Sequence, residues 1–328
     1  MIIGYHHPNR PELCHASSLA ALISEYRSPM RFDVLVNGGA GSVDAGEEGA
    51  LALAIEKAFG AAGARADVQI VDPAALHATV ERCWSGPDRP RAVVVAGGDG
   101  TVSSAAGAAA GTNIVLAVLP LGTFNHFAKD VGVPVDLTEA ATALVGGEVR
   151  VVDVAEVNGR VFVNNSLIGL YPDLVAVRDR IRDGRGWGKI RAVPLAMIEV
   201  LRRFPLHRLD LRGPGYERPR VRTPLVFVGN GVFAIQPGRP PARGDLSDGA
   251  MGIAVAHVVS RWGLIRMMLR ALLLGAEAAK DLDTVELTEL TIDAHVRHIR
   301  VAVDGEICWM DLPLRYRVRP ESLHVLVP

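Results

Sequence analysis

The sequence of 328 residues has few cysteines, almost no net charge and no long apolar run. Its three cysteines, Cys14, Cys83 and Cys308, lie far apart without a CxxC spacing, which argues against a disulfide framework or a zinc site. Such sparse cysteines are typical of a reducing cytosol. Acidic and basic residues are interspersed and the formal net charge is −1, so the composition provides no general attraction to nucleic acid.

Apolar runs are too short to span a bilayer, although 49% of the residues are hydrophobic. Arg266 and Arg270 interrupt one of the longest runs, near residues 267–274, and we expect no transmembrane helix. Residues 1–29 lack a basic segment followed by an apolar core, so we do not expect them to be a signal peptide. We predict a poorly ordered N-terminal extension there, with a short helix over 18–26 as the alternative. We expect the protein to be cytoplasmic.

Strands and helices alternate between residues 30 and 150. The pattern predicts strands at 32–36, 66–71, 91–96 and 114–119, and helices over 47–59 and from Pro73 to about Trp84. Asp72 is suited to cap the second of these helices, with Pro73 at its first position. Alternation of this kind implies a parallel sheet covered by helices on both faces.

The pattern changes at Arg150, after which short strands dominate. Two alternating runs at 151–157 and 160–164 flank Asn158-Gly159, which is a strong signal for a two-residue hairpin. Further strands are predicted at 221–229, 252–259, 284–292, 299–303 and 314–318, and helices over 189–204 and 262–279. We therefore predict a β-rich second domain over 151–318.

One glycine-rich stretch, Gly97-Gly98-Asp99-Gly100-Thr101, follows a predicted buried strand and precedes a helix. Ligands of open parallel sheets bind beyond the carboxyl ends of the strands, so the location favours a nucleotide. Consecutive glycines let backbone N–H groups approach phosphate oxygens, and the helix N-terminus adds positive charge. Asp99 can organise Mg²⁺ on those phosphates. An ordinary strand-to-helix turn is the alternative interpretation.

Two other loops follow predicted strands in the same way. In the loop at 120–128, Gly122 permits close approach, while Thr123 and Asn125 can offer a hydroxyl and an amide to phosphate; a helix cap at Thr123 is the alternative. The loop at 37–42 lacks the lysine and spacing of a P-loop and does not match GxGxxG. A Rossmann dehydrogenase is therefore disfavoured.

The three loops together resemble those of the diacylglycerol kinase catalytic-domain family, which includes bacterial soluble lipid kinases and the sphingosine and ceramide kinases. The shared motifs are NPxxG, GGDGTxNE and PxGTxNxFA, and the likeness runs from about residue 30 to the C-terminus. GGDGT also occurs in NAD kinases, whereas PLGTFNHFAKDVG is specific to lipid kinases. The resemblance implies an α/β domain like that of NAD kinase and phosphofructokinase over 30–150, to which a strand within 319–328 returns. A β-sandwich-like lipid-acceptor domain would occupy 151–318, giving a two-domain α+β protein.

The resemblance also implies an ATP-dependent lipid kinase, which transfers the γ-phosphoryl group of Mg·ATP to the hydroxyl of a lipid such as diacylglycerol or a sphingoid base. It assigns the ATP contacts to Asn37, Gly38, Gly39, Ala40, Gly41, Gly97, Gly98, Asp99, Gly100, Thr101, Val102, Ser103, Ser104, Gly122, Thr123 and Asn125. It assigns a structural Mg²⁺ to Asp248 as a ligand and to backbone oxygens of Asp245 and Ala250, with Asp153 in the same water and metal network. Read without the family, these are a polar turn and a strand end.

The resemblance places the element Asp304-Gly305-Glu306 against the γ-phosphate, where Asp304 or Glu306 accepts the proton of the lipid hydroxyl and Asp99 completes the catalytic set. Without the family, Asp304-Gly305 reads as a hairpin turn. Three positions depart from the family pattern: Gly38 replaces proline, Ser103-Ser104 replaces Asn-Glu, and His126 replaces an aspartate. Two other functions therefore stay open, an NAD-kinase-like enzyme with a soluble acceptor and a catalytically impaired regulator that binds nucleotide or lipid.

The predicted partner is a lipid substrate at the membrane surface, with peripheral contact at the inner face. In the segment 262–275, apolar residues including Leu264 and Leu269 form one face and Arg261, Arg266 and Arg270 the other, which suits a helix on an anionic bilayer or a core helix. A basic loop around 184–188 is a second candidate for headgroup contact, with a solvated face as the alternative. The acceptor lipid and the oligomeric state, a homodimer included, stay open.

Overall fold

The computed structural model describes residues 30–38, 48–86, 88–185, 189–204, 206–234, 242–274 and 281–328. The predicted N-terminal extension lies outside the described residues. So do Gly39, Ala40 and Gly41 of the first predicted loop, and residues 186–188 of the predicted basic loop.

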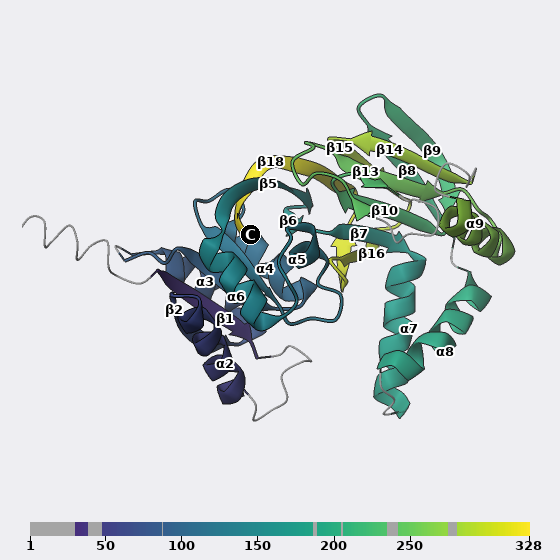
Figure 1. Ribbon diagram of the computed structural model, residues 1–328. Helices are drawn as coiled ribbons and strands as arrows, with labels where there is room; N and C mark the ends of the chain where they lie inside the picture. Colours follow the sequence, from purple (N-terminus) through teal and green to yellow (C-terminus); the bar gives the residue numbers. More distant parts are fainter. Residues whose placement is uncertain are drawn as a thin grey trace, which may run out of the picture.

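An α/β unit forms the first part of the protein (Figure 1). Its parallel strands are β1 (Arg31–Asn37), β2 (Arg65–Val71), β3 (Ala92–Gly97) and β4 (Val115–Pro120), in the order β2-β1-β3-β4. Its helices are α2 (Glu48–Ala61), η1 (Pro73–Ala75), α3 (Leu76–Trp84), α4 (Asp99–Ala109), α5 (His126–Asp130) and α6 (Leu137–Gly146). The predicted cap is present, because Asp72 Oδ1 accepts a 2.8 Å hydrogen bond from the N–H of Ala74.

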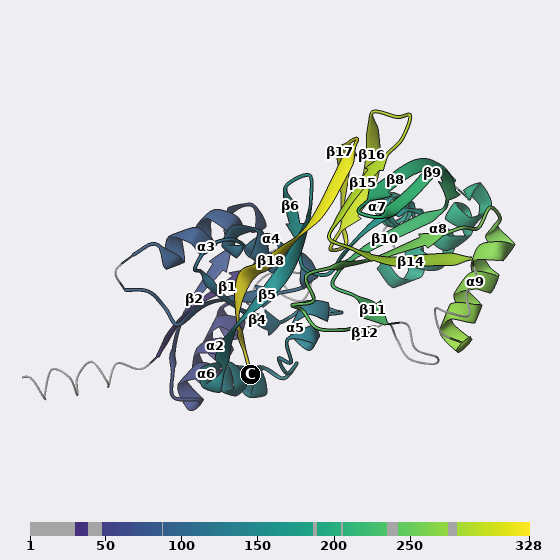
Figure 2. The same ribbon diagram turned by 90° about the horizontal axis from the view of Figure 1, so that it is seen from above.

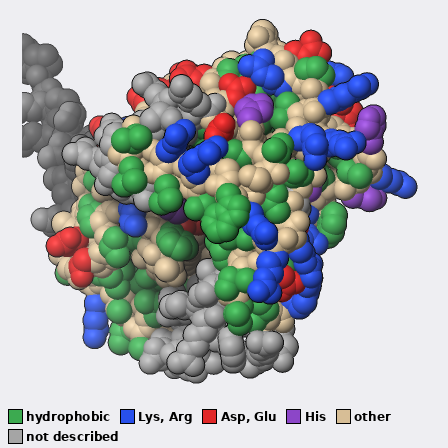
Figure 3. All heavy atoms as spheres, turned by 90° about the vertical axis from the view of Figure 1, so that its right-hand side faces the viewer, with side chains coloured by type: hydrophobic (Ala, Val, Ile, Leu, Met, Phe, Trp, Pro, Cys, Tyr) green, Lys and Arg blue, Asp and Glu red, His purple; other side chains and the backbone are tan. Residues whose placement is uncertain are grey.

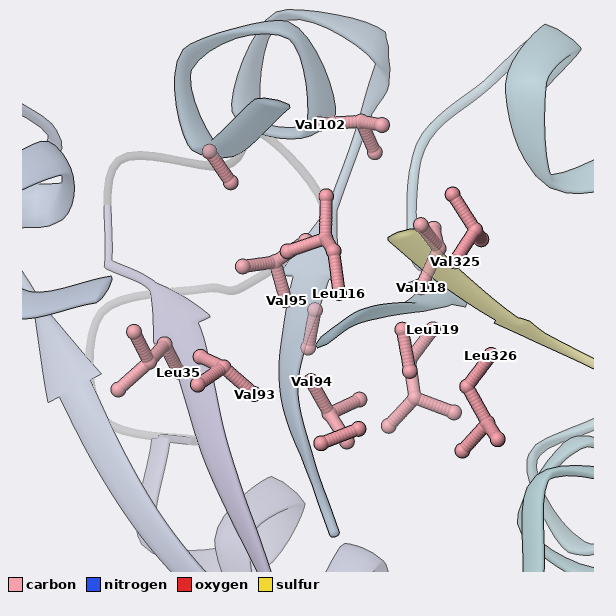
Figure 4. Packing of buried hydrophobic residues seen from close by; sticks show 14 of the residues in the cluster. Leu35, Val93, Val94, Val95, Val102, Leu116, Val118, Leu119, Val325 and Leu326 are labelled. Carbon is pink, nitrogen blue, oxygen red and sulfur yellow. The ribbon is translucent and has the colours of Figure 1, made fainter. Parts of the chain in front are cut away.

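The parallel sheet is buried between two pairs of helices. Helix α2 packs beside α6, and α3 packs beside α4 (Figure 2). The central strand β3 is buried along its whole length, and its valines pack with the side chains of β4 (Figure 4). Continuous apolar runs in the sequence therefore became strands covered on both faces. All of their carboxyl ends open at the same edge of the sheet.

The long strand β18 (Leu314–Val327) joins the two parts of the protein, as Figure 2 shows. Its end pairs in parallel with β4, with His324 opposite Val115, and much of its length pairs antiparallel with β5 (Glu148–Val157). The register shifts between Arg319 and Leu323, where Glu321 has a φ of 46°. Within the described residues this strand extends the sheet to ten strands, in the order β2-β1-β3-β4-β18-β15-β8-β9 with β5 and β6 beside it.

Antiparallel strands form the second part. The remaining strands of the long sheet are β6 (Arg160–Phe162), β8 (His207–Gly213), β9 (Tyr216–Thr223) and β15 (Glu289–Asp293). A six-stranded sheet contains β7 (Asn165–Gly169), β10 (Leu225–Asn230), β13 (Met251–Ala256), β14 (Leu282–Leu287), β16 (His298–Val303) and β17 (Glu306–Asp311), and a small ribbon contains β11 (Phe233–Ala234) and β12 (Ala242–Arg243). An apolar core that includes Phe162 and Tyr316 packs side chains from both large sheets together.

Three helices accompany these sheets: α7 (Leu170–Arg185), α8 (Lys189–Arg203) and α9 (Arg261–Leu274). Helix α7 was not predicted from the sequence. It also corrects the expected basic loop around 184–188, because residues 178–185 form the last turns of this helix. Its charged residues hide the helical period of the apolar ones. None of the helices in the described ranges has both the length and the apolar character to cross a bilayer.

Two predicted strands were wrong in the same way. The run at 221–229 is β9 and β10, and the run at 284–292 is β14 and β15, with the members of each pair in different sheets. The first break falls at Pro224, which has no N–H to continue a ladder. A chain that changes sheets keeps its alternation of apolar and polar residues, so the sequence pattern did not reveal either break.

Candidate functional site

A cleft of about 1270 Å³ opens at the carboxyl ends of the parallel strands. One wall contains residues of the predicted loops together with residues of η1, α3 and α4, and the other comes from the hairpin of β5 and β6 and from β17. The lining residues are Asn37, Pro73, Ala74, Leu76, His77, Gly98, Gly100, Thr101, Ser103, Ser104, Gly107, Leu121, Gly122, Thr123, Gly159, Arg160, Val161 and Glu306. Many of the predicted nucleotide contacts therefore share one cleft.

The second and third loops of the cleft touch through two glycines. A Cβ atom on Gly122 would lie 2.5 Å from the Cα of Gly98 and 2.8 Å from Asn125 Oδ1. Gly98 is the extended residue that precedes α4, so the first N–H groups of this helix open beside Gly122. Such exposed N–H groups at a helix N-terminus are suited to bind an anion.

Asn125 shapes this loop by bonding the backbone of Gly122, whereas the sequence had predicted that its amide contacts a phosphate. Its Oδ1 accepts a hydrogen bond of 2.8 Å from the N–H of Gly122, and its Nδ2 donates one of 2.7 Å to the oxygen of the same residue. Asn125 is buried and has a φ of 51°, a conformation that asparagine tolerates. The side chain therefore closes the turn and leaves Gly122 and Thr123 at the cleft.

We expect Gly122→Ala to weaken ATP binding by about tenfold or more, because overpacking of this kind costs about 1–3 kcal/mol and here separates the two loops. Titration calorimetry with ATP measures the effect. Gly60→Ala in α2 is the matched control, since a Cβ there would meet no atom within 4 Å. Equal affinities in both variants would contradict the proposed contact between the loops and phosphate.

Helix α4 divides its predicted contacts between the cleft and the core. Thr101 Oγ1 accepts a 2.7 Å hydrogen bond from Nδ2 of Asn37, which joins the first loop to the second. Ser103 and Ser104 line the cleft, whereas Val102 is 3% exposed and packs in the core (Figure 4). The helical period turns the Val102 side chain inward, so the predicted contact of this residue with ATP would come from its backbone.

Asp99 lies where the second loop, the third loop and the second domain meet. Its Oδ1 accepts a 2.8 Å hydrogen bond from the N–H of His126 and lies 3.5 Å from Nδ2 of Asn164. Its Oδ2 makes no hydrogen bond to the described part of the chain. The carboxylate is half-buried at the start of α4, so it keeps one oxygen for a further ligand.

Asp304 occupies the turn between β16 and β17, which is the hairpin that Asp304-Gly305 indicates when read without the family. Its carboxylate accepts N–H groups from Val163 at 2.8 Å and from Asn164 and Asn165 at 2.9 Å each. Burial raises the pKa of this carboxyl, and hydrogen bonds from these amides and from the Ser103 hydroxyl oppose the rise. Asp304 therefore ties the hairpin to the strand ends beside α4.

Glu306 faces the cleft. Its side chain is 58% exposed, and Oε2 lies 2.5 Å from Nη2 of Arg160. A Cβ atom on Gly100 would lie 3.1 Å from Oε1, so the carboxylate reaches the N-terminal turn of α4. Of the two acids that the sequence left as alternatives, Glu306 is the one with access to a ligand in the cleft.

Three residues of the site were missed by sequence reasoning: Arg160, Asn164 and Arg243. Arg160 directly follows the predicted Asn158-Gly159 turn, which could have signalled a side chain at the tip of a hairpin. Asn164 donates its N–H to Asp304 and approaches Asp99 through its amide, so it connects two of the predicted catalytic acids. No local pattern marks that role.

Arg243 has a buried side chain that contacts Asn164 and the strands next to it. Its side chain is 1% exposed, and its guanidinium donates to the oxygen of Val163 at 2.6 Å, to the oxygen of Asn230 at 3.0 Å and to Asn164 Oδ1 at 3.2 Å. It also pairs with Asp130 at the end of α5. The contacts link the first domain to the β strands that hold Asn164.

The residues of the predicted structural Mg²⁺ site lie around Asp153. Asp153 accepts N–H groups from Gly249 at 2.7 Å and Glu321 at 2.8 Å, and the oxygen of Ala250 accepts the N–H of Gly231. Asp245 and Asp248 do not join Asp153 in a group of three metal-ligating side chains, and the described ranges contain no such group. The turn at 245–249 closes on Asp153 through hydrogen bonds, and the predicted Mg²⁺ site, in which Asp248 is a ligand and Asp245 and Ala250 supply backbone oxygens, stays a prediction.

Comparisons with known proteins indicate the family and the fold of this chain. A family model described as the diacylglycerol kinase catalytic domain matches residues 31–157. A diacylglycerol kinase of Mycobacterium tuberculosis is 32% identical over 253 residues, covering 72% of this chain and 77% of that protein. A protein of Pectobacterium atrosepticum named "Probable lipid kinase YegS-like" is 26% identical over 245 residues, covering 72% and 78%. The crystal structure of a diacylglycerol kinase from Bacillus anthracis has the same fold, with a TM-score of 0.64 at 20% identity over 92% of this chain and 98% of that one.

Proposed function

Because the chain belongs to the diacylglycerol kinase catalytic-domain family, we propose that it transfers the γ-phosphoryl group of Mg·ATP to the hydroxyl of a lipid such as diacylglycerol or a sphingoid base. The observation that carries the proposal is the juxtaposition of Glu306 with the glycine loops across one cleft. Phosphoryl transfer depends mainly on alignment of the reactants and on neutralisation of charge, and this cleft supports both.

The glycine loops are suited to hold the phosphates of ATP. Gly98 and Gly122 bring backbone atoms to the cleft without side chains, and the helix dipole of α4 places partial positive charge beside them. The hydroxyls of Thr101 and Ser104 line the same region. Ligand pockets commonly measure about 300–1,000 Å³, so a cleft of about 1270 Å³ leaves room for a nucleotide and the end of an acceptor.

Asp99 is the residue that fits a Mg²⁺ ion carried by the nucleotide. Mg²⁺ in such sites is held by one or two carboxylates together with phosphate oxygens and water, and Asp99 Oδ2 is unengaged by the described residues. When bound, Mg²⁺ supplies positive charge that neutralises the transferred phosphoryl group. The hydrogen bonds from His126 and Asn164 hold Oδ1 and so orient the carboxylate.

Glu306 is the proposed base, with Arg160 beside it. A carboxylate at the mouth of the cleft can accept the proton of a lipid hydroxyl, whereas the oxygens of Asp304 are occupied by backbone amides. Arg160 is the only arginine or lysine that lines the cleft within the described ranges. Its guanidinium can therefore position Glu306 and stabilise negative charge on the phosphates.

Arg160→Gln is expected to lower kcat by about 100-fold, the typical effect of removing one charged donor from a developing anion. Arg160→Lys should recover part of that loss, because the charge remains while the planar fork is lost. Initial rates at saturating ATP measure both variants. The matched control is Arg222→Gln, which removes an exposed arginine from β9, and an equal loss there would rule out a specific role for Arg160.

The function is tested by incubating the pure protein with labelled ATP, Mg²⁺ and a membrane lipid extract, followed by identification of the labelled product by mass spectrometry. A phosphorylated lipid is the expected product. A parallel incubation offers NAD as the acceptor, and labelled NADP in place of lipid would favour the NAD-kinase-like alternative. Tight ATP binding without transfer to either acceptor would support a regulator that has lost catalysis.

A further inference from the structure

Helix α9 carries apolar side chains on two sides. Leu264 and Met267 are each 4% exposed and pack in a small cluster with residues of the second domain. On the outer side, Trp262, Leu269 and Leu273 are 71%, 51% and 65% exposed. Packing in the core therefore explains the inner side of α9. The outer side is also apolar but has no partner among the described residues.

A shallow groove of about 380 Å³ lies along this outer side. It is lined by Trp262, Ile265, Arg266, Leu269, Arg270, Leu273 and Leu274, which we call the α9 surface. The sequence had separated Arg266 and Arg270 from the apolar face, but the structure places them in the same surface as Leu269. The spacing of 262, 266, 269 and 273 follows the helical period, so all four share one face.

The charge of the α9 surface is positive. Arg266 lies 3.9 Å from Asp281, which partly balances it, whereas Arg270 and the neighbouring Arg261 have no acidic partner in the described part of the chain. Figure 3, which faces the end of the molecule that carries α9, shows hydrophobic side chains interspersed with blue arginine and lysine side chains. Exposed leucines beside arginines without acidic partners are complementary to a surface whose outer layer is anionic and whose interior is apolar.

We propose that the α9 surface docks on a bilayer that contains anionic phospholipid. Trp262, Leu269 and Leu273 enter the interface between headgroups and acyl chains, where the indole ring is favoured. Arg266 and Arg270 bind headgroup phosphates, each strengthening the attachment near an anionic surface. The choice of a bilayer as the occupant rests on the proposed lipid substrate, but the docking itself requires neither ATP nor catalysis.

The test is cosedimentation of the full chain with vesicles, without nucleotide. Wild-type protein is expected to bind vesicles of equal parts phosphatidylglycerol and phosphatidylcholine, and to bind pure phosphatidylcholine weakly. Leu269→Ser/Leu273→Ser should lower the partition coefficient about tenfold, because apolar area no longer leaves water. Arg266→Gln/Arg270→Gln should lower it about 30-fold at low salt and less at high salt.

The controls remove the same groups elsewhere. Trp309→Ser on β17 removes a large apolar side chain that is 65% exposed and lies outside the α9 surface. Arg208→Gln/Arg222→Gln removes two exposed arginines that face each other on β8 and β9. Unfolding temperatures establish that each variant is folded. Partition equal to wild type in both α9 double variants would overturn the proposal, and so would equal losses in the controls.

Two further outcomes are informative. If the α9 variants convert a dimer of the wild-type chain to monomers and leave vesicle binding unchanged, the surface belongs to a second copy and the proposal is wrong. Phosphorylation of a detergent-dispersed lipid does not require docking, so the α9 variants should retain it. If the α9 variants lose vesicle binding but keep that activity, docking is separated from the proposed function. If the wild-type protein does not bind vesicles, the docking proposal is wrong, and if it does not phosphorylate the dispersed lipid, the proposed function is wrong.

Discussion

Asp99→Asn should lower the rate of lipid phosphorylation by about 10³-fold, because the substitution removes the charge that would hold Mg²⁺ on the phosphates. The protein should remain folded. An asparagine oxygen can still accept the N–H of His126, as Asp99 Oδ1 does at 2.8 Å, and asparagine serves as well as aspartate at such positions. Single-turnover measurements with labelled ATP, together with thermal unfolding, separate the two effects.

Asp136→Asn is the matched control for this variant. Asp136 also accepts backbone N–H groups at the start of a helix, from Thr138 at 2.9 Å and Glu139 at 3.0 Å, but that helix is α6, which packs beside α2 and contributes no residue to the cleft. Its replacement should leave the rate unchanged. Retention of lipid phosphorylation by Asp99→Asn would remove Asp99 from the mechanism, whereas a large drop in its unfolding temperature would assign it a structural role.

Glu306→Gln should lower kcat by about 10²–10⁴-fold, the usual contribution of a general base, with little change in stability. The side chain is 58% exposed, so replacement by an amide of the same shape leaves no buried group unpaired. Glu286→Gln, on the exposed face of β14, is the control for loss of an acid from the second domain. Dependence of kcat on pH in wild type and variant is the further readout.

Asp304→Asn should behave in the opposite way, and the contrast identifies the base. An amide keeps only one oxygen, so its NH₂ group must face either the N–H of Val163, which donates to Oδ2 at 2.8 Å, or those of Asn164 and Asn165, which donate to Oδ1 at 2.9 Å. Unpaired buried groups of this kind cost about 1–3 kcal/mol each, so the unfolding temperature should fall markedly. If Asp304→Asn folds normally and loses activity while Glu306→Gln keeps it, the assignment reverses.

The loops illustrate how far local patterns reach. Gly98 and Gly122 were recognised from the residues around them, because a glycine after a buried strand and before a helix has a local meaning. Parallel strands end at one edge, so their placement in a common cleft also followed. By contrast, the role of Asn125 depends on which way its amide turns, and only the folded loop shows it closing on Gly122.

Long-range contacts explain what was missed. Arg243 meets Asp130 of α5 across a separation of 113 residues, and Asn164 meets Asp304 across 140. Neither contact follows from a periodic pattern or a fixed spacing in the chain, so no sequence pattern could have predicted it. The sheet changes at Pro224 and at Thr288 were missed for the same reason, since alternation continues while the hydrogen-bonding partners change.

The sequence by itself determined the alternating α/β order of the first half, the hairpins at Asn158-Gly159 and Asp304-Gly305, and the motifs that carry the family resemblance. These features depend on periodicity and on the conformations of glycine, which act over a few residues. The tertiary structure decided that Glu306 faces the cleft while Asp304 is buried, and that Arg266 and Arg270 share a surface with Leu269. Exposure and charge at those positions are set by segments distant in the chain, which come together only when both sheets have packed.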